Sequence, residues 1–479
     1  MMSRVTPTNL EDFWRLRAPE RQLLLWALLI ALLGYLMLLG AQTKEGLDVR
    51  LSALIPLLVF MGAFVSAHLS LVLARFRGDQ LLLPVTALLS AIGLMAQART
   101  GLLGAGALHG SKLALLPLGV ALMLTITIAG RQGRYRLAAR ATWVWGVFSL
   151  LLMALVLVTG QRYRGAVYGL GLITPTELLK LTMVLFTAAF VDQHIKRLSR
   201  WRGLLPPLAP HWRLLLVWGA LLSMLLLQRD LGLVLILGLT LIAVLAAGTR
   251  QPGYLLYGLV LGGAAGAVLI RFFSHGLSRV EVWMNPFTDP TGAGWQVLQG
   301  LSGMYAGGLW GEGFSEARPR YTPIAESDLI YAVWAEELGF AGSLLLLLLF
   351  AVLLTRLLTL AARARTPFGL MAATGVATVL SVQTVLNVGG VTKALPLTGI
   401  TLPLISHGGS SLLTVFASLG LVLAISDGEP VKSRAKTSAP KVAPKASKTS
   451  KATNMPDVYR VGYGLRRKGG VKPVKSSPQ

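Results

Sequence analysis

Residues 271–342 form the stretch that decides the fold: RFFSHGLSRVEVWMNPFTDPTGAGWQVLQGLSGMYAGGLWGEGFSEARPRYTPIAESDLIYAVWAEELGFAG. It is the one long polar connection between hydrophobic segments, and it begins where an apolar run ends at Leu269–Ile270. Its acidic residues include Asp289, Glu312, Glu316, Glu326 and Asp328. If the chain carries out chemistry, we expect it on this connection and on the helix ends beside it.

The composition around this stretch indicates a membrane protein. The chain has 479 residues, of which 54% are hydrophobic and only 14% charged, which is too apolar and too long for one soluble core. Apolar runs of about 18 or more residues recur, and each can cross a bilayer core of roughly 30 Å. The predicted fold class is therefore an all-α, polytopic membrane protein. The absence of cysteine excludes disulfides and thiolate metal sites, and the six histidines show no metal-binding spacing.

We predict about twelve transmembrane helices. Their approximate ranges are 22–41, 52–74, 80–97, 113–129, 141–159, 172–192, 212–227, 231–248, 252–270, 329–355, 367–386 and 404–426. The seventh and eighth are separated by QRDLG at 228–232, which is either a tight turn or a kink in one long helix. Arginines precede the first span without a small-residue cleavage site, so we expect an uncleaved span rather than a signal peptide.

Lys and Arg are more frequent in the links on the N-terminal side of the membrane, which predicts cytoplasmic termini and an outer loop at 271–328. The basic Ser-, Ala- and Pro-rich tail, 429–479, is predicted to be disordered. It either attracts anionic lipid or a cytoplasmic partner, or has no specific role. Because the net charge of +25 comes partly from this tail, it does not indicate nucleic-acid binding.

Two groups of charged residues near the outer surface need an explanation. Arg162 and Arg164 lie in an outer link, and Glu177 and Lys180 follow in ITPTELLK. The i, i+3 spacing puts Glu177 and Lys180 on one helix face. They form either a structural ion pair or, with the two arginines, an anion-binding pocket aimed at phosphates.

Other acidic residues also allow two readings. Asp230 in QRDLG is typical of a turn, with a structural or supporting role as the alternative. Asp328 fits a helix start, where a carboxylate complements the helix dipole, but it is also placed to accept a proton from a bound hydroxyl. Glu336 and Glu337 lie deeper, so we expect them to face the helix bundle, pair with cations and serve packing or support.

The run LPLTGITLPLISHGGSS, residues 395–411, follows Lys393 and cannot be one continuous helix, because it contains two prolines and a Gly-Gly pair. Backbone left unpaired at membrane depth is tolerated where it is buried in protein or lines a cavity. The run is either a re-entrant packing loop or a ligand site. The ligand-site candidates are Lys393, Ser406, His407, Ser410 and, in the preceding helix, Asn387.

At these residues the chain resembles the SEDS family (shape, elongation, division and sporulation), which includes FtsW, RodA and SpoVE. The resemblance covers roughly residues 140–426. It rests on NVGGVTKALPLTGITLPLISHGGSS, NPFTDPTGAGWQVLQ, GGLWGEGF and YTPIAESDLIYAVWAEELGFAG, with QRDLG and TPTELLK as weaker motifs. The first two spans look like an N-terminal addition to the family's usual ten.

The resemblance implies a peptidoglycan glycosyltransferase of the bacterial cytoplasmic membrane, active in cell division or cell-shape maintenance. It would polymerise glycan strands from lipid II beside a class B penicillin-binding protein. Carried over by position, the family's catalytic aspartate falls on Asp328, its arginine on Arg162 or Arg164, and its motif lysine on Lys180. Five motifs depart from the usual pattern: QRYRGAV, TPTE, QRDLG, TPI and the histidine in SHGGSS.

The expected mechanism is inverting glycosyl transfer, with Asp328 as the base and a polyprenyl pyrophosphate as the leaving group. Arg162, Arg164, Lys180 and Lys393 would offset its charge, alone or with a divalent cation such as Mg or Mn; no protein metal ligands are predicted. The alternatives are a flippase for lipid-linked sugars and an inactive scaffold for a transpeptidase. The expected organisation is N-terminal helices over 1–139, a catalytic membrane core over 140–428 and the basic tail.

Overall fold

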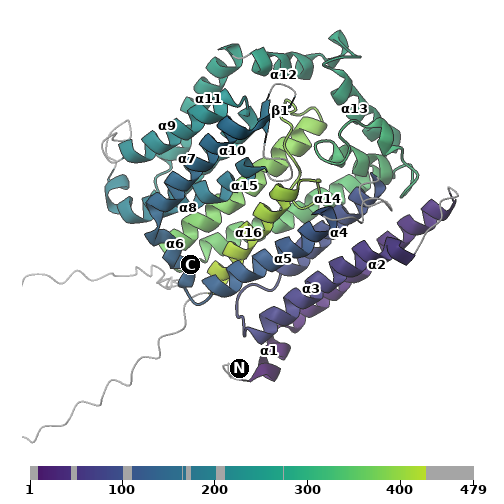
Figure 1. Ribbon diagram of the computed structural model, residues 1–479, viewed down its shortest axis with the longest axis horizontal. Coiled ribbons are helices and arrows are strands. Elements are labelled where there is room, and N and C mark those ends of the chain that lie inside the picture. The colour runs from purple at the N-terminus through teal and green to yellow at the C-terminus, as the bar shows by residue number, and fades with distance from the viewer. Residues whose placement is uncertain are drawn as a thin grey trace, which may run out of the picture. The chain divides into compact units, whose positions relative to one another are not determined.

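The computed structural model describes residues 9–44, 51–100, 111–163, 166–168, 174–200, 211–272 and 274–427. Twelve of its described helices are long and apolar (Figure 1). They are α2 (Ala18–Lys44), α3 (Ile55–Leu73), α4 (Leu82–Arg99), α5 (Ser111–Gly130), α7 (Thr142–Thr159), α8 (Pro175–Leu198), α9 (Trp212–Leu227), α10 (Leu231–Thr249), α11 (Gly253–Phe272), α14 (Ile330–Ala362), α15 (Pro367–Val391) and α16 (Gly409–Ser426).

Shorter elements connect these helices. The short α-helices are α1 (Leu10–Leu16), α6 (Leu137–Arg140), α12 (Ser274–Met284) and α13 (Trp295–Gly307). Single 3₁₀ turns are η1 (Leu51–Leu54), η2 (Arg134–Arg136), η3 (Pro286–Thr288) and η4 (Pro319–Tyr321). An antiparallel hairpin of β1 (Gln161–Tyr163) and β2 (Ala166–Tyr168), which the sequence did not predict, joins α7 to the segment before α8.

The prediction of an all-α polytopic membrane protein is confirmed. Nine described helices are long and apolar enough to cross a membrane, α5 counts as a tenth if it is taken with the bent segment after it, and α9 and α11 are shorter apolar helices. Each predicted range overlaps one of these helices, although α16 begins five residues later than predicted and α14 ends seven residues later. The QRDLG sequence separates α9 from α10, so it is a turn and not a kink. The predicted disordered tail lies outside the described residues.

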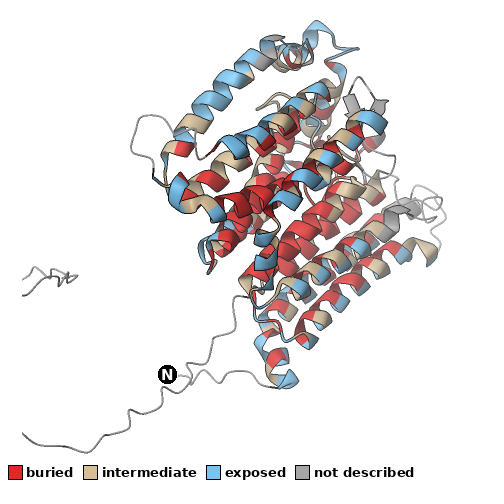
Figure 2. Cartoon of the chain, turned by 60° about the vertical axis from the view of Figure 1, so that its left-hand side comes forward, coloured by how far each residue is buried: buried red, intermediate tan, exposed pale blue. Residues whose placement is uncertain are grey.

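The helices that carry the site form the buried centre of the bundle. Helices α4, α8, α15 and α16 are largely buried, whereas α7 and α14 present much of their surface outward. Helix α16 packs against α5, α8, α14 and α15, and α15 also packs against α8 and α10. Figure 2 shows the buried residues concentrated between the helices and the exposed residues on the outer faces of the bundle. The candidate site lies at the end of this centre where α15 is joined to α16.

The first two long helices are attached to the bundle by a buried polar cluster. Helix α2 packs mainly against α4, and α3 against α5. Arg17 pairs with Glu20 and donates to the carbonyl of Phe76 at 3.2 Å, while His68 lies 2.6 Å from the Glu20 carboxylate. A buried charge is tolerated where it is paired and hydrogen-bonded, and these contacts fix the start of α2 against the end of α3.

The stretch 271–328, predicted as a polar loop, is mostly helical. Helix α13 buries Val297, Gly300 and Gly307 on one side and packs against α14. This side follows roughly helical spacing, which the Gly-rich composition masked in the sequence. Helix α14 has a break at Gly339, whose φ of 66° and ψ of −165° suit glycine alone.

The break at Gly339 brings two chain segments together. The backbone N–H of Phe340 donates to Gly308 at 2.9 Å, and that of Ala341 donates to Leu309 at 3.0 Å. A Cβ on Gly339 would lie 2.3 Å from the nitrogen of Gly311, so the close approach depends on glycine. The break therefore anchors the segment after α13 to the outer end of α14.

We expect Gly339→Ala to lower the free energy of unfolding by about 2–4 kcal/mol, because it adds both backbone strain and a backbone clash. The measurement is thermal unfolding of the purified protein in detergent. The control is Gly219→Ala in α9, where nothing lies within 4 Å of the added Cβ. Equal midpoints for the two variants would contradict the role given to Gly339.

Candidate active site

An irregular segment, 392–408, separates α15 from α16 at one end of the bundle. Its lack of helix agrees with the prediction from Pro396, Pro403 and Gly408. The side chains of Leu402, Leu404 and Ile405 are buried in the protein core. Because this backbone has no helical partners, its polar groups need hydrogen bonds from elsewhere.

Side chains of α15 and its neighbours provide these bonds. Asn387 donates to the carbonyl of Ile400 at 2.7 Å, and Gln383 donates to that of Thr401 at 2.9 Å. The Ser406 hydroxyl accepts from the backbone N–H of Leu402 at 2.8 Å. The segment is thereby held in one conformation, although no regular secondary structure supports it.

The same segment, together with Asn387 of α15, binds the chain around Asp328. Asn387 also donates to the carbonyl of Asp328 at 2.9 Å, Ser406 donates to that of Ser327 at 2.5 Å, and the backbone N–H of His407 donates to that of Glu326 at 2.7 Å. The sequence placed Asn387, Ser406 and His407 in a possible ligand site, and the structure brings all three to the segment that carries Asp328.

The Asp328 carboxylate lies beside Gly399 of the irregular segment, where no side chain occupies the space. Gly399 has φ of 73°, and a Cβ there would lie 3.5 Å from Oδ2 of Asp328. Helix α14 begins at Ile330 with Leu329 as its N-cap, so Asp328 lies directly before the helix start that the sequence indicated. The half-buried carboxylate instead lies beside bare backbone of the irregular segment.

Glu177 and Lys180 form the predicted ion pair, with 2.6 Å between Lys180 Nζ and a Glu177 oxygen. The buried ammonium also donates to Gln383 at 3.1 Å, and Gln383 in turn holds Thr401 of the irregular segment. Helix α8 starts one residue after Thr174, which makes no side-chain cap bond. The backbone N–H of Thr174 instead donates to the hydroxyl of Ser410 in α16 at 2.7 Å.

Asp230 is the N-cap of α10, where its carboxylate accepts from the backbone N–H of Leu233 at 2.9 Å. This contact confirms its reading as a turn residue. Burial raises the pKa of the Asp230 carboxyl, while the bond from Leu233 and the charges of Lys180 and Arg279 lower it. The turn residue is therefore also an electrostatic neighbour of the Lys180 pair.

The remaining predicted site residues are Lys393, Arg162 and Arg164. The carbonyl of Lys393 accepts from the indole N–H of Trp283 in α12 at 2.9 Å, which ties α12 to the irregular segment. Arg162 belongs to β1, but its side chain lies outside the described part, as does the whole of Arg164.

Glu336 and Glu337 are buried at the outer end of α14 and face protein. Glu337 pairs with Arg99 of α4 at 2.7 Å and accepts from the backbone N–H of Ser315. Glu336 accepts from the backbone N–H of Arg318 at 3.1 Å. Both carboxylates face the bundle, as expected. The expected pairing with a cationic side chain is found for Glu337, whereas Glu336 accepts from a backbone N–H instead.

Comparison with known proteins identifies the family. Residues 71–430 match the model of the FtsW/RodA/SpoVE family, described as cell cycle protein. The chain belongs to this family. It is 32% identical over 401 residues to the peptidoglycan glycosyltransferase RodA of Mycobacterium tuberculosis strain ATCC 25618 / H37Rv, covering 80% of this chain and 86% of that protein.

Two further relatives agree with this membership. Stage V sporulation protein E of Bacillus subtilis strain 168 is 35% identical over 302 residues, covering 59% of this chain and 80% of the relative. A solved structure titled as the structural coordination of polymerization and crosslinking by a peptidoglycan synthase complex matches with a TM-score of 0.57. It is 28% identical and covers 73% of this chain and 98% of that one.

Two polar residues of this FtsW/RodA/SpoVE member escaped the sequence analysis. Gln383 links Lys180 to the irregular segment, and Arg279 of α12 donates to the carbonyl of Thr398 at 2.7 Å. A polar side chain in the middle of the apolar α15 was a usable signal for Gln383. Arg279 gave no such signal, because the sequence treated its helix as loop.

The described residues do not fit a protein-held metal ion. Among them, no three His, Asp or Glu side chains gather closely enough to coordinate one.

We expect Asp230→Ala to lower the free energy of unfolding by about 1 kcal/mol relative to Asp230→Asn, because asparagine keeps the cap acceptor and alanine removes it. Thermal unfolding in detergent measures this difference. Both variants remove the charge, so a loss of activity that is equal in the two would be assigned to the charge. Equal stability of the two variants would contradict the capping role.

Proposed function

We propose that this family member polymerises glycan strands at the outer face of the bacterial cytoplasmic membrane, with lipid II as both donor and acceptor. The observation that carries the proposal is the position of Asp328. Its carbonyl accepts from Asn387 of α15, which also holds Ile400 of the irregular segment, and its carboxylate borders Gly399, which carries no side chain. Relatives that match most of the chain are named peptidoglycan glycosyltransferases.

In the proposed reaction, the Asp328 carboxylate accepts the proton of a sugar hydroxyl on the acceptor. The hydroxyl oxygen then forms a bond to the anomeric carbon of the donor, while the bond from that carbon to the phosphate oxygen breaks. The leaving group departs as polyprenyl pyrophosphate, and the configuration at the anomeric carbon is inverted. The proton held by Asp328 passes to solvent before the next cycle.

Fixed cations would stabilise the charge that grows on the pyrophosphate. Lys180 is oriented by Glu177 and Gln383, and Arg279 is oriented by its bond to the carbonyl of Thr398. The planar guanidinium of Arg279 has further N–H groups suited to phosphate oxygens. We assign Lys393 to the same role, together with Arg162 and Arg164 from the hairpin region. Preorganised charges of this kind stabilise the transition state without reorganisation.

The proposed setting follows the membrane orientation. With both termini in the cytoplasm, α12, α13 and Asp328 face outward, where lipid II presents its sugars. A class B penicillin-binding protein is the proposed partner, and a relative was solved as part of a peptidoglycan synthase complex. The process served is cell division or cell-shape maintenance.

We expect Asp328→Asn to lower polymerisation by about 10²–10⁴-fold, because the amide cannot act as the general base. The measurement is glycan-strand formation and polyprenyl pyrophosphate release from labelled lipid II in proteoliposomes, with and without a class B penicillin-binding protein from the same organism. Thermal unfolding checks that the variant folds.

The matched control is Glu281→Gln on α12, which also neutralises an exposed carboxylate and should retain full activity. Unchanged turnover in Asp328→Asn would contradict the base role. Transport of lipid II across the bilayer by wild type, without pyrophosphate release under any condition, would replace the polymerase with the flippase.

A further inference from the structure

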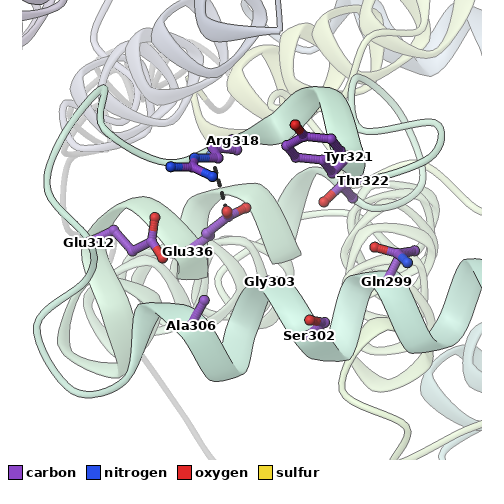
Figure 3. Close-up of a pocket in the computed structure, with 9 residues that line it drawn as sticks. All are labelled: Gln299, Ser302, Gly303, Ala306, Glu312, Arg318, Tyr321, Thr322 and Glu336. Carbon is purple, nitrogen blue, oxygen red and sulfur yellow. Dashed lines mark hydrogen bonds between the residues drawn. The ribbon is translucent and has the colours of Figure 1, made fainter.

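Two adjoining cavities lie on the outer side of the protein, apart from the irregular segment. The first has a volume of about 410 Å³ and lies between α13, the segment that follows it and α14 (Figure 3). The second has about 680 Å³ and extends from the first toward α4 and Glu326. Arg318, Tyr321 and Thr322 line both, so the two cavities adjoin. Their sizes suit a bound organic group.

The cavity wall is fixed by two neighbouring residues of α14. The carbonyl of Glu336 accepts from the backbone N–H of Glu312 at 3.0 Å, and its carboxylate accepts from that of Arg318 at 3.1 Å. Glu337 holds the intervening Gly313 and Ser315 in the same way. With their main chains attached to α14, Glu312 and Arg318 present exposed side chains at preset positions.

The lining offers both signs of charge. Figure 3 shows Glu312, Arg318 and Glu336 around one hollow, with Ser302 and Gln299 along α13. Among the described residues, no ion pair involves the side chain of Glu312 or Arg318. A cavity with an exposed carboxylate, an exposed guanidinium and neutral hydrogen-bonding groups suits a ligand that itself carries both charges.

The second cavity reaches the neighbourhood of the proposed base. Glu326 lines it and lies two residues before Asp328, and its carbonyl accepts from the His407 backbone. The cavity thus begins two residues along the chain from the proposed base. The cavity is exposed to the side on which the product is released in the proposed orientation.

The proposed product supplies a ligand of the required chemistry. A transpeptidase that cross-links glycan strands needs peptides on those strands, and an unlinked peptide carries both carboxylate and ammonium groups. We propose that the two cavities bind the peptide side chain of the growing glycan strand, with Arg318 holding a carboxylate and Glu312 an ammonium group. This inference rests on the proposed function and assigns a peptide subsite to it.

Direct binding tests the subsite without requiring turnover. The probe is a soluble disaccharide-peptide, compared with the same disaccharide without its peptide, on full-length protein in nanodiscs by calorimetry. We expect the peptide-bearing probe to bind wild type, and Arg318→Gln or Glu312→Gln to weaken its binding roughly tenfold each. Arg318→Lys should retain most of the affinity because it keeps the charge.

The controls are Arg271→Gln at the end of α11 and Glu281→Gln on α12, which remove exposed charges outside both cavities. They should leave binding unchanged. Equal affinity of wild type for the two probes, or equal weakening by all four neutralising variants, would overturn the proposal. If the probe fails to bind but Arg318→Gln weakens association with the transpeptidase, the cavities belong to a protein interface and the proposal is wrong.

Turnover separates this inference from the proposed function. Arg318→Gln should lower polymerisation of peptide-bearing lipid II severalfold, through KM rather than kcat, and leave a peptide-free lipid-linked disaccharide unaffected. If wild type polymerises neither substrate, the proposed function fails, and the calorimetry still decides whether the cavities bind peptide. If Arg318→Gln affects both substrates equally, the peptide subsite is wrong while the polymerase stands.

Discussion

The irregular backbone of residues 392–408 imposes the constraint on which the rest of the site depends. Its N–H and C=O groups lie at the outer end of an apolar bundle, where each needs a protein partner. Asn387 and Gln383 supply two of them, and each also reaches a second functional element: Asn387 bonds the main chain of Asp328, and Gln383 bonds Lys180. The requirement for hydrogen bonds thus places the proposed base and a proposed cation around one segment.

Sequence periodicity and composition were sufficient for the helices, because an apolar run that crosses a membrane has few alternative structures. The broken segment before α16 was also predictable from its prolines and glycines. The outer stretch was not: α13 buries a Gly-rich face, and the break at Gly339 depends on a close contact with residues about thirty positions earlier. Contacts of this kind are absent from local sequence patterns.

The same reasoning explains which site residues were found. Asp328, Lys180 and Asn387 stood out because polar groups are rare in or beside apolar runs. Arg279 lies on a helix that looked like loop, so only its bond to Thr398 revealed it. The Ser-Asp pattern correctly indicated a helix start at Asp328, although the N-cap itself is Leu329. Family motifs named the catalytic candidate, and geometry supplied the neighbours that orient it.

The most direct test of the account is a cryo-EM structure of the protein in nanodiscs with a non-reactive lipid II analogue. The account predicts the pyrophosphate beside Lys180 and Arg279, and a sugar hydroxyl within about 3 Å of the Asp328 carboxylate. An analogue bound elsewhere on the bundle, with the segment 392–408 making no contact to it, would contradict the central claim that this segment assembles the active site.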